Sequence, residues 1–139
     1  MKVVFADTGY WVAVLNPKDD WHDQATIASR ALGKFRLITT EMVLDELLAA
    51  LSKVPVRAAV IRGVDAIRSN PNIEIWPQTS LQFSESFEAY RRMSDKEWSL
   101  TDCASFAVMR ERGVAEALAH DHHFEQAGFV ALLREATSA

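Results

Sequence analysis

Short apolar runs alternate with longer amphipathic segments along this chain. The runs are rich in β-branched, leucine and aromatic residues, and they predict strands, because a strand buried inside a parallel sheet is apolar on both faces. The predicted strands cover residues 2–6, 35–38, 73–76 and 117–119, with a weaker fifth over residues 129–133. Strands that alternate with helices in this way predict an α/β protein with a parallel sheet and right-handed crossovers.

Helical patterns fill the intervals between these runs. One apolar stripe consists of Val43, Leu44, Leu47, Leu48 and Leu51. Asp20 is expected to cap a helix, and Ser99 with Asp102 has the spacing of a capping box before a helix that Gly113 ends. The predicted helices cover residues 8–15, 20–32, 41–53, 56–69, 79–93 and 99–112.

Length and composition predict one globular domain over residues 1–139. Hydrophobic residues make up 49% of the chain and charged residues 24%, which is typical of a soluble protein. Cys103 is the single cysteine, so an intrachain disulfide is excluded. The N-terminal residues do not have the pattern of a signal peptide, and no apolar stretch is long enough to span a bilayer. A cytoplasmic protein without membrane contact is therefore expected.

Acidic residues occupy places where a small α/β fold needs no charge. Asp7 and Asp121 each follow an apolar run, and ligands of parallel sheets bind beyond the carboxyl ends of the strands. Asp102 shares a helix face with Phe106 and Met109. Carboxylates that converge repel one another, and a divalent cation is the usual reason for such a cluster. The net charge of -4 counts against binding of nucleic acid through overall basicity, but it does not count against a metal-dependent nuclease.

Each of these residues also has a purely structural explanation. Asp7 alone is explained as a helix N-cap, and Asp102 as a carboxylate favoured by a helix dipole. Helical spacing cannot choose between Asp45 and Glu46, which lie on opposite edges of one apolar stripe. The hydroxyls of Thr8 and Ser99 can cap helices or orient a carboxylate.

A cluster of histidines next to Asp121 raises the question of zinc. His120, His122 and His123 surround this acid, but His22 is the only other histidine and Cys103 has no partner motif. A polar turn is the simpler interpretation of these histidines.

Four segments together resemble a known family. They are residues 5–8 (FADT), 43–47 (VLDEL), 99–107 (SLTDCASFA) and 121–124 (DHHF), and they span nearly the whole chain. In this order they resemble the PIN-domain ribonucleases, and specifically the VapC-type toxins of toxin–antitoxin systems.

The resemblance implies a fold, a site and a reaction. The fold is a three-layer α/β/α sandwich, a PIN-like fold with a central parallel sheet of four or five strands. The site acids are Asp7, Glu46, Asp102 and Asp121. Asp7 and Asp102 are expected to be the principal ligands of Mg²⁺ or Mn²⁺, Glu46 to complete the site or orient the attacking water, and Asp121 to hold a metal-bound water or a second ion, which leaves one or two ions open. Thr8 and Ser99 match auxiliary hydroxyl positions. The reaction is endonucleolytic hydrolysis of RNA that leaves a 3′-hydroxyl and a 5′-phosphate.

The resemblance also implies partners, namely a small cognate antitoxin that occupies the acidic groove and a second copy of the chain in a homodimer. The alternative is a PIN-like module that binds RNA or protein and has lost its chemistry, and the full set of acids argues against it. A phosphatase or receiver domain is disfavoured because Asp7-Thr8-Gly9 lacks a second nearby acid. A glycine-rich phosphate loop is absent, so nucleotide-binding folds are disfavoured too.

Overall fold

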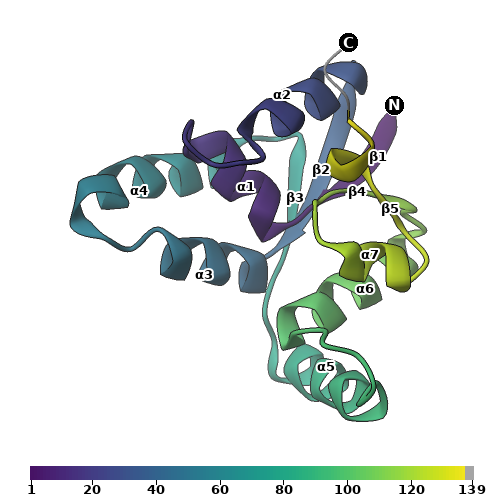
Figure 1. Ribbon diagram of the computed structural model, residues 1–139. Helices are drawn as coiled ribbons and strands as arrows, with labels where there is room; N and C mark the ends of the chain where they lie inside the picture. The colour runs from purple at the N-terminus through teal and green to yellow at the C-terminus, as the bar shows by residue number, and fades with distance from the viewer. Residues whose placement is uncertain (137–139) are drawn as a thin grey trace.

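The structure is a computed structural model and describes residues 1–136 of the chain (Figure 1). Its elements are β1 (Lys2–Ala6), α1 (Thr8–Leu15), α2 (His22–Ala31), β2 (Phe35–Thr40), α3 (Glu41–Ala50), α4 (Val54–Ser69), β3 (Ile73–Trp76), α5 (Ser80–Arg92), α6 (Leu100–Arg112), β4 (Glu116–Leu118), α7 (His122–Gln126), β5 (Val130–Ala131) and α8 (Leu132–Glu135).

The strands form one five-stranded sheet in the order β3-β2-β1-β4-β5, and every neighbouring pair is parallel. The chain moves outward from β1 through β2 to β3 and then crosses back to add β4 on the other side of β1. Right-handed crossovers therefore place α1–α4 on one face of the sheet and α5 and α6 on the other, as the packing of these helices against one another confirms (Figure 1). The predicted three-layer fold with a central parallel sheet is confirmed.

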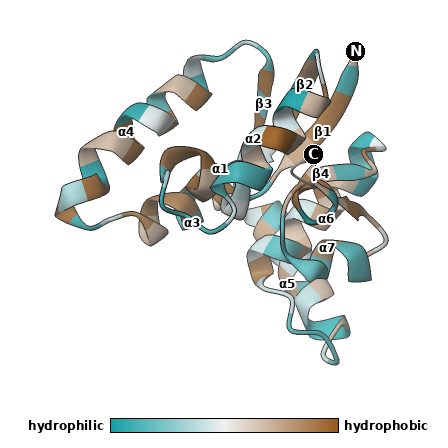
Figure 2. Ribbon diagram, turned by 45° about the horizontal axis from the view of Figure 1, so that its top comes forward, coloured by the Kyte–Doolittle hydropathy of each residue, from teal (hydrophilic) through white to brown (hydrophobic). Residues whose placement is uncertain are grey.

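The core lies where the apolar runs predict it. Val4, Phe5 and Ala6 of β1 are fully buried at the centre of the sheet, which explains why this strand carries no alternating polar residue. On the α6 face, the Phe106 ring packs edge-on against Phe124 with centroids 5.0 Å apart. Figure 2 shows hydrophobic residues concentrated along β1 and on one side of the surrounding helices. The contact between Phe106 and Phe124 packs α7 against α6.

Several predicted boundaries are wrong. The helix expected from residue 56 begins at Val54, because Pro55 lies in the first turn of α4, where a missing backbone N–H costs nothing. Asp20 is not a cap: Trp21 occupies that position and makes no side-chain cap bond. The weak strand expected over residues 129–133 is shortened to β5, and the chain turns into α8 at Leu132.

Two short helices, α7 and α8, were not predicted at all. Residues His122–Gln126, interpreted as part of a polar turn, form α7, with Asp121 as the N-cap. No helix among residues 1–136 combines the length and the apolar character that a membrane crossing requires.

Candidate active site

The site begins where β1 and β4 end. The backbone N–H of Asp7 donates to the Leu118 carbonyl at 3.1 Å, so the strand ends that precede Asp7 and Asp121 are tied together. The Thr39 hydroxyl donates to the Ala6 carbonyl at 2.9 Å and holds β1 from its other side. The order of the strands reverses between β1 and β4, and ligands of α/β sheets bind at such a point.

Asp7 is a buried carboxylate whose side chain does not cap α1. It precedes α1 with extended backbone, but its side chain makes no capping hydrogen bond, and only 8% of the residue is exposed. Asp7 thus occupies the N-cap position of α1, as interpreted, but capping by its side chain does not explain the carboxylate. A buried acid without a capping role needs another partner for its charge.

Asp102 lies at the N-terminus of α6, and there the capping interpretation is correct. The Ser99 hydroxyl accepts from the Asp102 backbone at 3.0 Å, and Asp102 Oδ2 accepts from the Ser99 backbone at 3.0 Å. This capping box fixes the Asp102 side chain at the start of the helix, and Ser99 contributes by orienting it.

The structure distinguishes the two acids of α3. Glu46 is half-buried and accepts a hydrogen bond of 2.6 Å from the Thr8 hydroxyl, whereas Asp45 is exposed. Because Thr8 follows Asp7 directly, this bond brings Glu46 to the end of β1. Glu46 thus lies with the other acids, as the family resemblance implied and helical spacing could not decide.

Electrostatics confirm that the acids converge. The pKa of Asp7 is raised to about 8, mainly by burial and then by the charges of Asp102, Glu46 and Asp121, while a hydrogen bond from the Thr8 backbone lowers it. Burial also raises the pKa of Asp102, with a further contribution from Asp121. Without a bound cation, Asp7 and Asp102 therefore hold their protons more tightly than free aspartates do.

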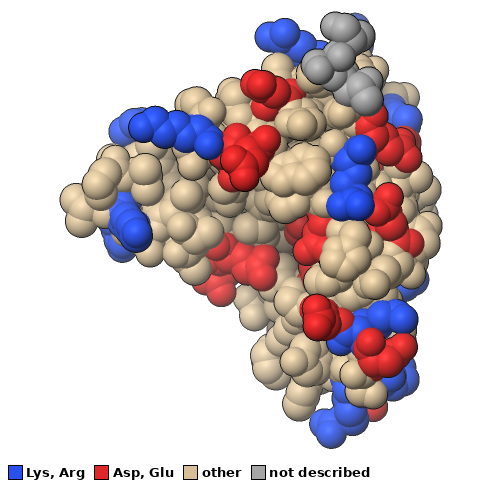
Figure 3. Space-filling model, viewed as in Figure 1, with Lys and Arg blue, Asp and Glu red and all other residues tan. Residues whose placement is uncertain are grey.

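The donor set fits a hard divalent cation. Within residues 1–136, no Lys or Arg forms an ion pair with Asp7, Glu46, Asp102 or Asp121, and the basic side chains that lie close to Asp102 and Asp121 are His122 and His123. Figure 3 shows acidic side chains on both sides of a hollow between α3 and α7. Carboxylate oxygens in this number suit Mg²⁺ or Mn²⁺.

Two histidines of the 120–123 segment have contacts that the sequence did not reveal. His123 Nδ1 lies 2.9 Å from Asp102 Oδ2 and 3.2 Å from Asp121 Oδ1. The His120 ring stacks on Trp21 with centroids 4.7 Å apart. No periodicity marks these histidines, because they follow a three-residue strand and their partners are distant in the chain.

The histidine segment also offers a second set of ligand atoms. One ligand atom each from Asp121, His122 and His123 lies within 4.8 Å of the others. His123 Nδ1, however, is already engaged by two carboxylates, and His122 is mostly exposed. The mixed set is therefore a weaker fit to an ion than the four carboxylates.

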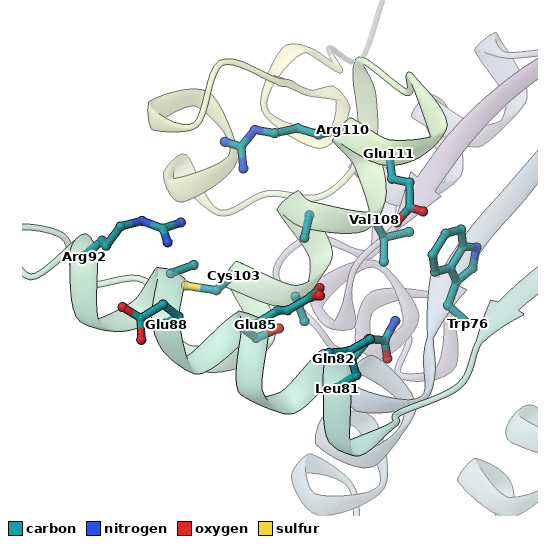
Figure 4. A pocket seen from close by; sticks show the side chains of 14 residues that line it. Trp76, Leu81, Gln82, Glu85, Glu88, Arg92, Cys103, Val108, Arg110 and Glu111 are labelled. Atoms are coloured by element: carbon teal, nitrogen blue, oxygen red, sulfur yellow. The ribbon is translucent and has the colours of Figure 1, made fainter.

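A separate cleft of about 620 Å³ lies between α5 and α6 (Figure 4). Trp76, Leu81, Cys103 and Val108 supply apolar lining, and charged residues such as Arg92 surround it. None of the four acids lines this cleft. It is therefore distinct from the carboxylate site at the ends of β1 and β4.

Comparison with known proteins defines the class. Residues 4–130 match the PIN domain family, and the chain belongs to that family. It is 30% identical over 128 residues to the 23S rRNA-specific endonuclease VapC20 from two strains of Mycobacterium tuberculosis, covering 92% of this chain and 96% of that protein. The predicted resemblance to VapC-type toxins is confirmed.

The fold of this chain is also similar to the folds of solved structures. The crystal structure of Mycobacterium tuberculosis VapC20, described as a sarcin-ricin loop cleaving toxin, has a TM-score of 0.82 and 30% identity, covering 92% of this chain and 97% of that one. VapBC2 from Rickettsia felis and FitAcB from Neisseria gonorrhoeae each reach a TM-score of 0.60 at 14% identity; the alignments cover 92% of this chain, and 96% and 94% of theirs. At that identity they support the fold alone.

Proposed function

We propose that this protein is a metal-dependent endoribonuclease and the toxin of a type II toxin–antitoxin pair. The observation that carries the proposal is the convergence of four carboxylates to which no Lys or Arg is paired within the described residues. Membership of the PIN domain family and the identity with VapC20 support the same conclusion. A buried acidic cluster of this kind is costly unless it serves a bound cation.

The residues divide into ligands and orienting groups. Asp7 and Asp102 are the most buried acids and are the proposed ligands of Mg²⁺ or Mn²⁺. When bound, the ion neutralises the phosphate charge and makes water a better nucleophile. Glu46, held by the Thr8 hydroxyl, is placed to orient the attacking water, and Asp121 completes the acidic rim.

The proposed reaction is hydrolysis of one phosphodiester bond. The water oxygen forms a bond to phosphorus while the bond between phosphorus and the 3′-oxygen breaks. The proton of the water passes to a carboxylate, for which Glu46 is the proposed acceptor, and the leaving oxygen gains a proton from solvent. The products are a 3′-hydroxyl and a 5′-phosphate.

A structured ribosomal RNA is the proposed substrate. VapC20 is named as specific for 23S rRNA and as cleaving the sarcin-ricin loop. The net charge of -4 requires that RNA contacts come from local basic groups and not from the whole surface. Ribosomal RNA is therefore the first substrate to test.

Protein partners are part of the proposal. A cognate antitoxin would insert a basic side chain among the carboxylates and so neutralise them. A second copy of the chain would bury apolar surface such as Phe83, Phe87 and Tyr90 on α5, which are 46%, 45% and 49% exposed. Exposed aromatic residues gathered on one helix are typical of a protein interface.

The test compares cleavage of purified ribosomal RNA by the wild-type protein and by Asp102→Asn, in Mg²⁺, in Mn²⁺ and in EDTA, with cut sites mapped by primer extension. We expect defined cuts by the wild type with metal, none in EDTA, and a rate lowered by about 10² to 10³-fold in Asp102→Asn. Binding of RNA without any cleavage would instead support the inactive PIN-like module, and equal cleavage by Asp102→Asn would remove the assigned site.

A further inference from the structure

His123 lies between two of the four acids. Its side chain is 14% exposed, and its Nδ1 atom is 2.9 Å from Asp102 Oδ2 and 3.2 Å from Asp121 Oδ1. Asp102 belongs to α6, whereas Asp121 is the N-cap of α7, so the imidazole joins acids that are carried by different elements. Chain connectivity alone does not fix the distance between these two side chains.

We propose that His123 is a positioning residue of the active site, whose Nδ1–H holds the carboxylates of Asp102 and Asp121 together so that their free oxygens face one ligand. This inference rests on the proposed function, because it assigns His123 a task in the same acidic site. From the sequence alone, His123 was interpreted as part of a polar turn.

The hydrogen bonds leave one oxygen of each acid available. Asp102 Oδ2 accepts from the Ser99 backbone and is hydrogen-bonded to His123 Nδ1, whereas Asp121 Oδ1 accepts from the His123 backbone N–H and lies 3.2 Å from the same Nδ1. Among the described residues, Asp102 Oδ1 and Asp121 Oδ2 accept no hydrogen bond. Each carboxylate is thus held by one oxygen while the other is free for a cation.

Electrostatics explain why a donor is needed at this place. The charge of Asp121 disfavours ionisation of Asp102, which is a direct sign that the two acids repel each other. Asp121 is also the less constrained of the two, with a side chain that is 37% exposed against 11% for Asp102. A hydrogen bond to a charged acceptor is about twice as strong as one between neutral groups, so the imidazole offsets repulsion that would otherwise turn Asp121 toward solvent.

The geometry also selects one nitrogen. Both contacts involve Nδ1, so the proposed role requires the tautomer with its proton on Nδ1, and within residues 1–136 Nε2 has no hydrogen-bond partner. In an asparagine at this position the amide nitrogen can take the place of Nδ1, whereas the amide of a glutamine lies one atom farther out. Substitutions can therefore separate the role of Nδ1 from that of general polarity.

The experiment measures two quantities: the Mn²⁺ affinity, by calorimetry, and kcat and KM for RNA cleavage. Both are measured in the wild type and in four variants, His123→Leu, His123→Asn, His123→Gln and His122→Leu. Groups that orient metal ligands typically contribute about 10- to 100-fold, and we expect His123→Leu to lose affinity and kcat in that range with KM changed less than about 3-fold. His123→Asn should recover most of the loss and His123→Gln little of it. His122→Leu is the matched control, since His122 is 58% exposed and its Nδ1 lies 3.5 Å from Asp121.

Two further outcomes separate this inference from the proposed function. If the wild type cuts no RNA but His123→Leu still weakens Mn²⁺ binding, the positioning role stands and the ribonuclease proposal fails. If His123→Leu binds Mn²⁺ and cuts RNA like the wild type, the positioning role is overturned while the ribonuclease stands. Should His123→Leu fail to fold, the contrast between His123→Asn and His123→Gln decides, and equal affinities in these two variants would overturn the role of Nδ1.

Discussion

The buried carboxylate of Asp7 lowers the stability of the metal-free protein, although the proposed function requires this acid in the site. Its pKa is raised from 3.8 to about 8, so only well below pH 3.8 is the side chain fully protonated in both the folded and the unfolded chain, where it costs nothing. The unfolded chain loses this proton as the pH rises through 3.8, and the metal-free fold is progressively destabilised up to about pH 8, where the folded chain also ionises. Above pH 8 the penalty is constant.

Asp7→Asn should therefore stabilise the metal-free protein and abolish cleavage. We expect the gain in Tm, measured by thermal unfolding in EDTA, to be larger at pH 8 than at pH 5 and to reach at least about 4 °C at pH 8, since 1 kcal/mol shifts Tm by about 2 to 8 °C in domains of comparable size. A gain in Tm that is the same at both pH values, or a loss of stability, would contradict a raised pKa of the buried Asp7 carboxyl group.

Glu46 and Asp45 offer a matched pair of adjacent acids at the same scale. The Glu46 carboxylate accepts a hydrogen bond from the Thr8 hydroxyl in the site, whereas the Asp45 side chain is exposed. Glu46→Gln should lower the rate of RNA cleavage by about 10²-fold or more, because the neutral amide no longer orients or accepts a proton from water. Asp45→Asn should leave the rate within about 2-fold of wild type. The reverse result would show that the wrong acid of α3 was assigned.

At the scale of elements, the first turn of α6 both stabilises the helix and positions Asp102 in the site. Ser99→Ala removes the hydroxyl that caps this helix and should cost about 1 kcal/mol of stability, measured by urea unfolding. It should also weaken Mn²⁺ binding, because the same capping box fixes the Asp102 side chain. Ser99→Thr keeps the hydroxyl and serves as the control. Unchanged metal affinity in Ser99→Ala would show that the capping box supports the helix alone.

The elements differ in how far the sequence reveals them. The helix over residues 99–112 was predicted because a capping box, an apolar face and Gly113 all agree, and Gly113 indeed ends α6 with φ 64°. In contrast, α7 has five residues, too few for a 3.6-residue period to be visible. Likewise β5 has two residues and exists because β4 pairs with it.

At the scale of the whole molecule, metal binding and stability are linked. A cation that binds only the folded chain stabilises it by about 2.7 kcal/mol at 100 times its dissociation constant. We therefore expect Tm to rise with Mn²⁺ concentration and to fall again with EDTA, and the apparent affinity to increase from pH 6 to pH 8, because binding must release the proton of Asp7. Asp102→Asn should lose most of the Tm increase. A Tm that does not respond to Mn²⁺ in the wild type would contradict a metal site in the carboxylate cluster.

The sequence by itself determined the parallel sheet and the main helices, and it indicated Asp7, Asp102 and Asp121 as candidate site acids, because periodicity and strand ends depend on neighbouring residues. Resemblance to a family added the choice of Glu46 over Asp45. Only the tertiary structure decided that Asp7 does not cap α1, that the Thr8 hydroxyl reaches Glu46, and that His123 joins Asp102 to Asp121. Those contacts link residues as far as 38 positions apart, and a contact between distant residues leaves no trace in the periodicity of either segment.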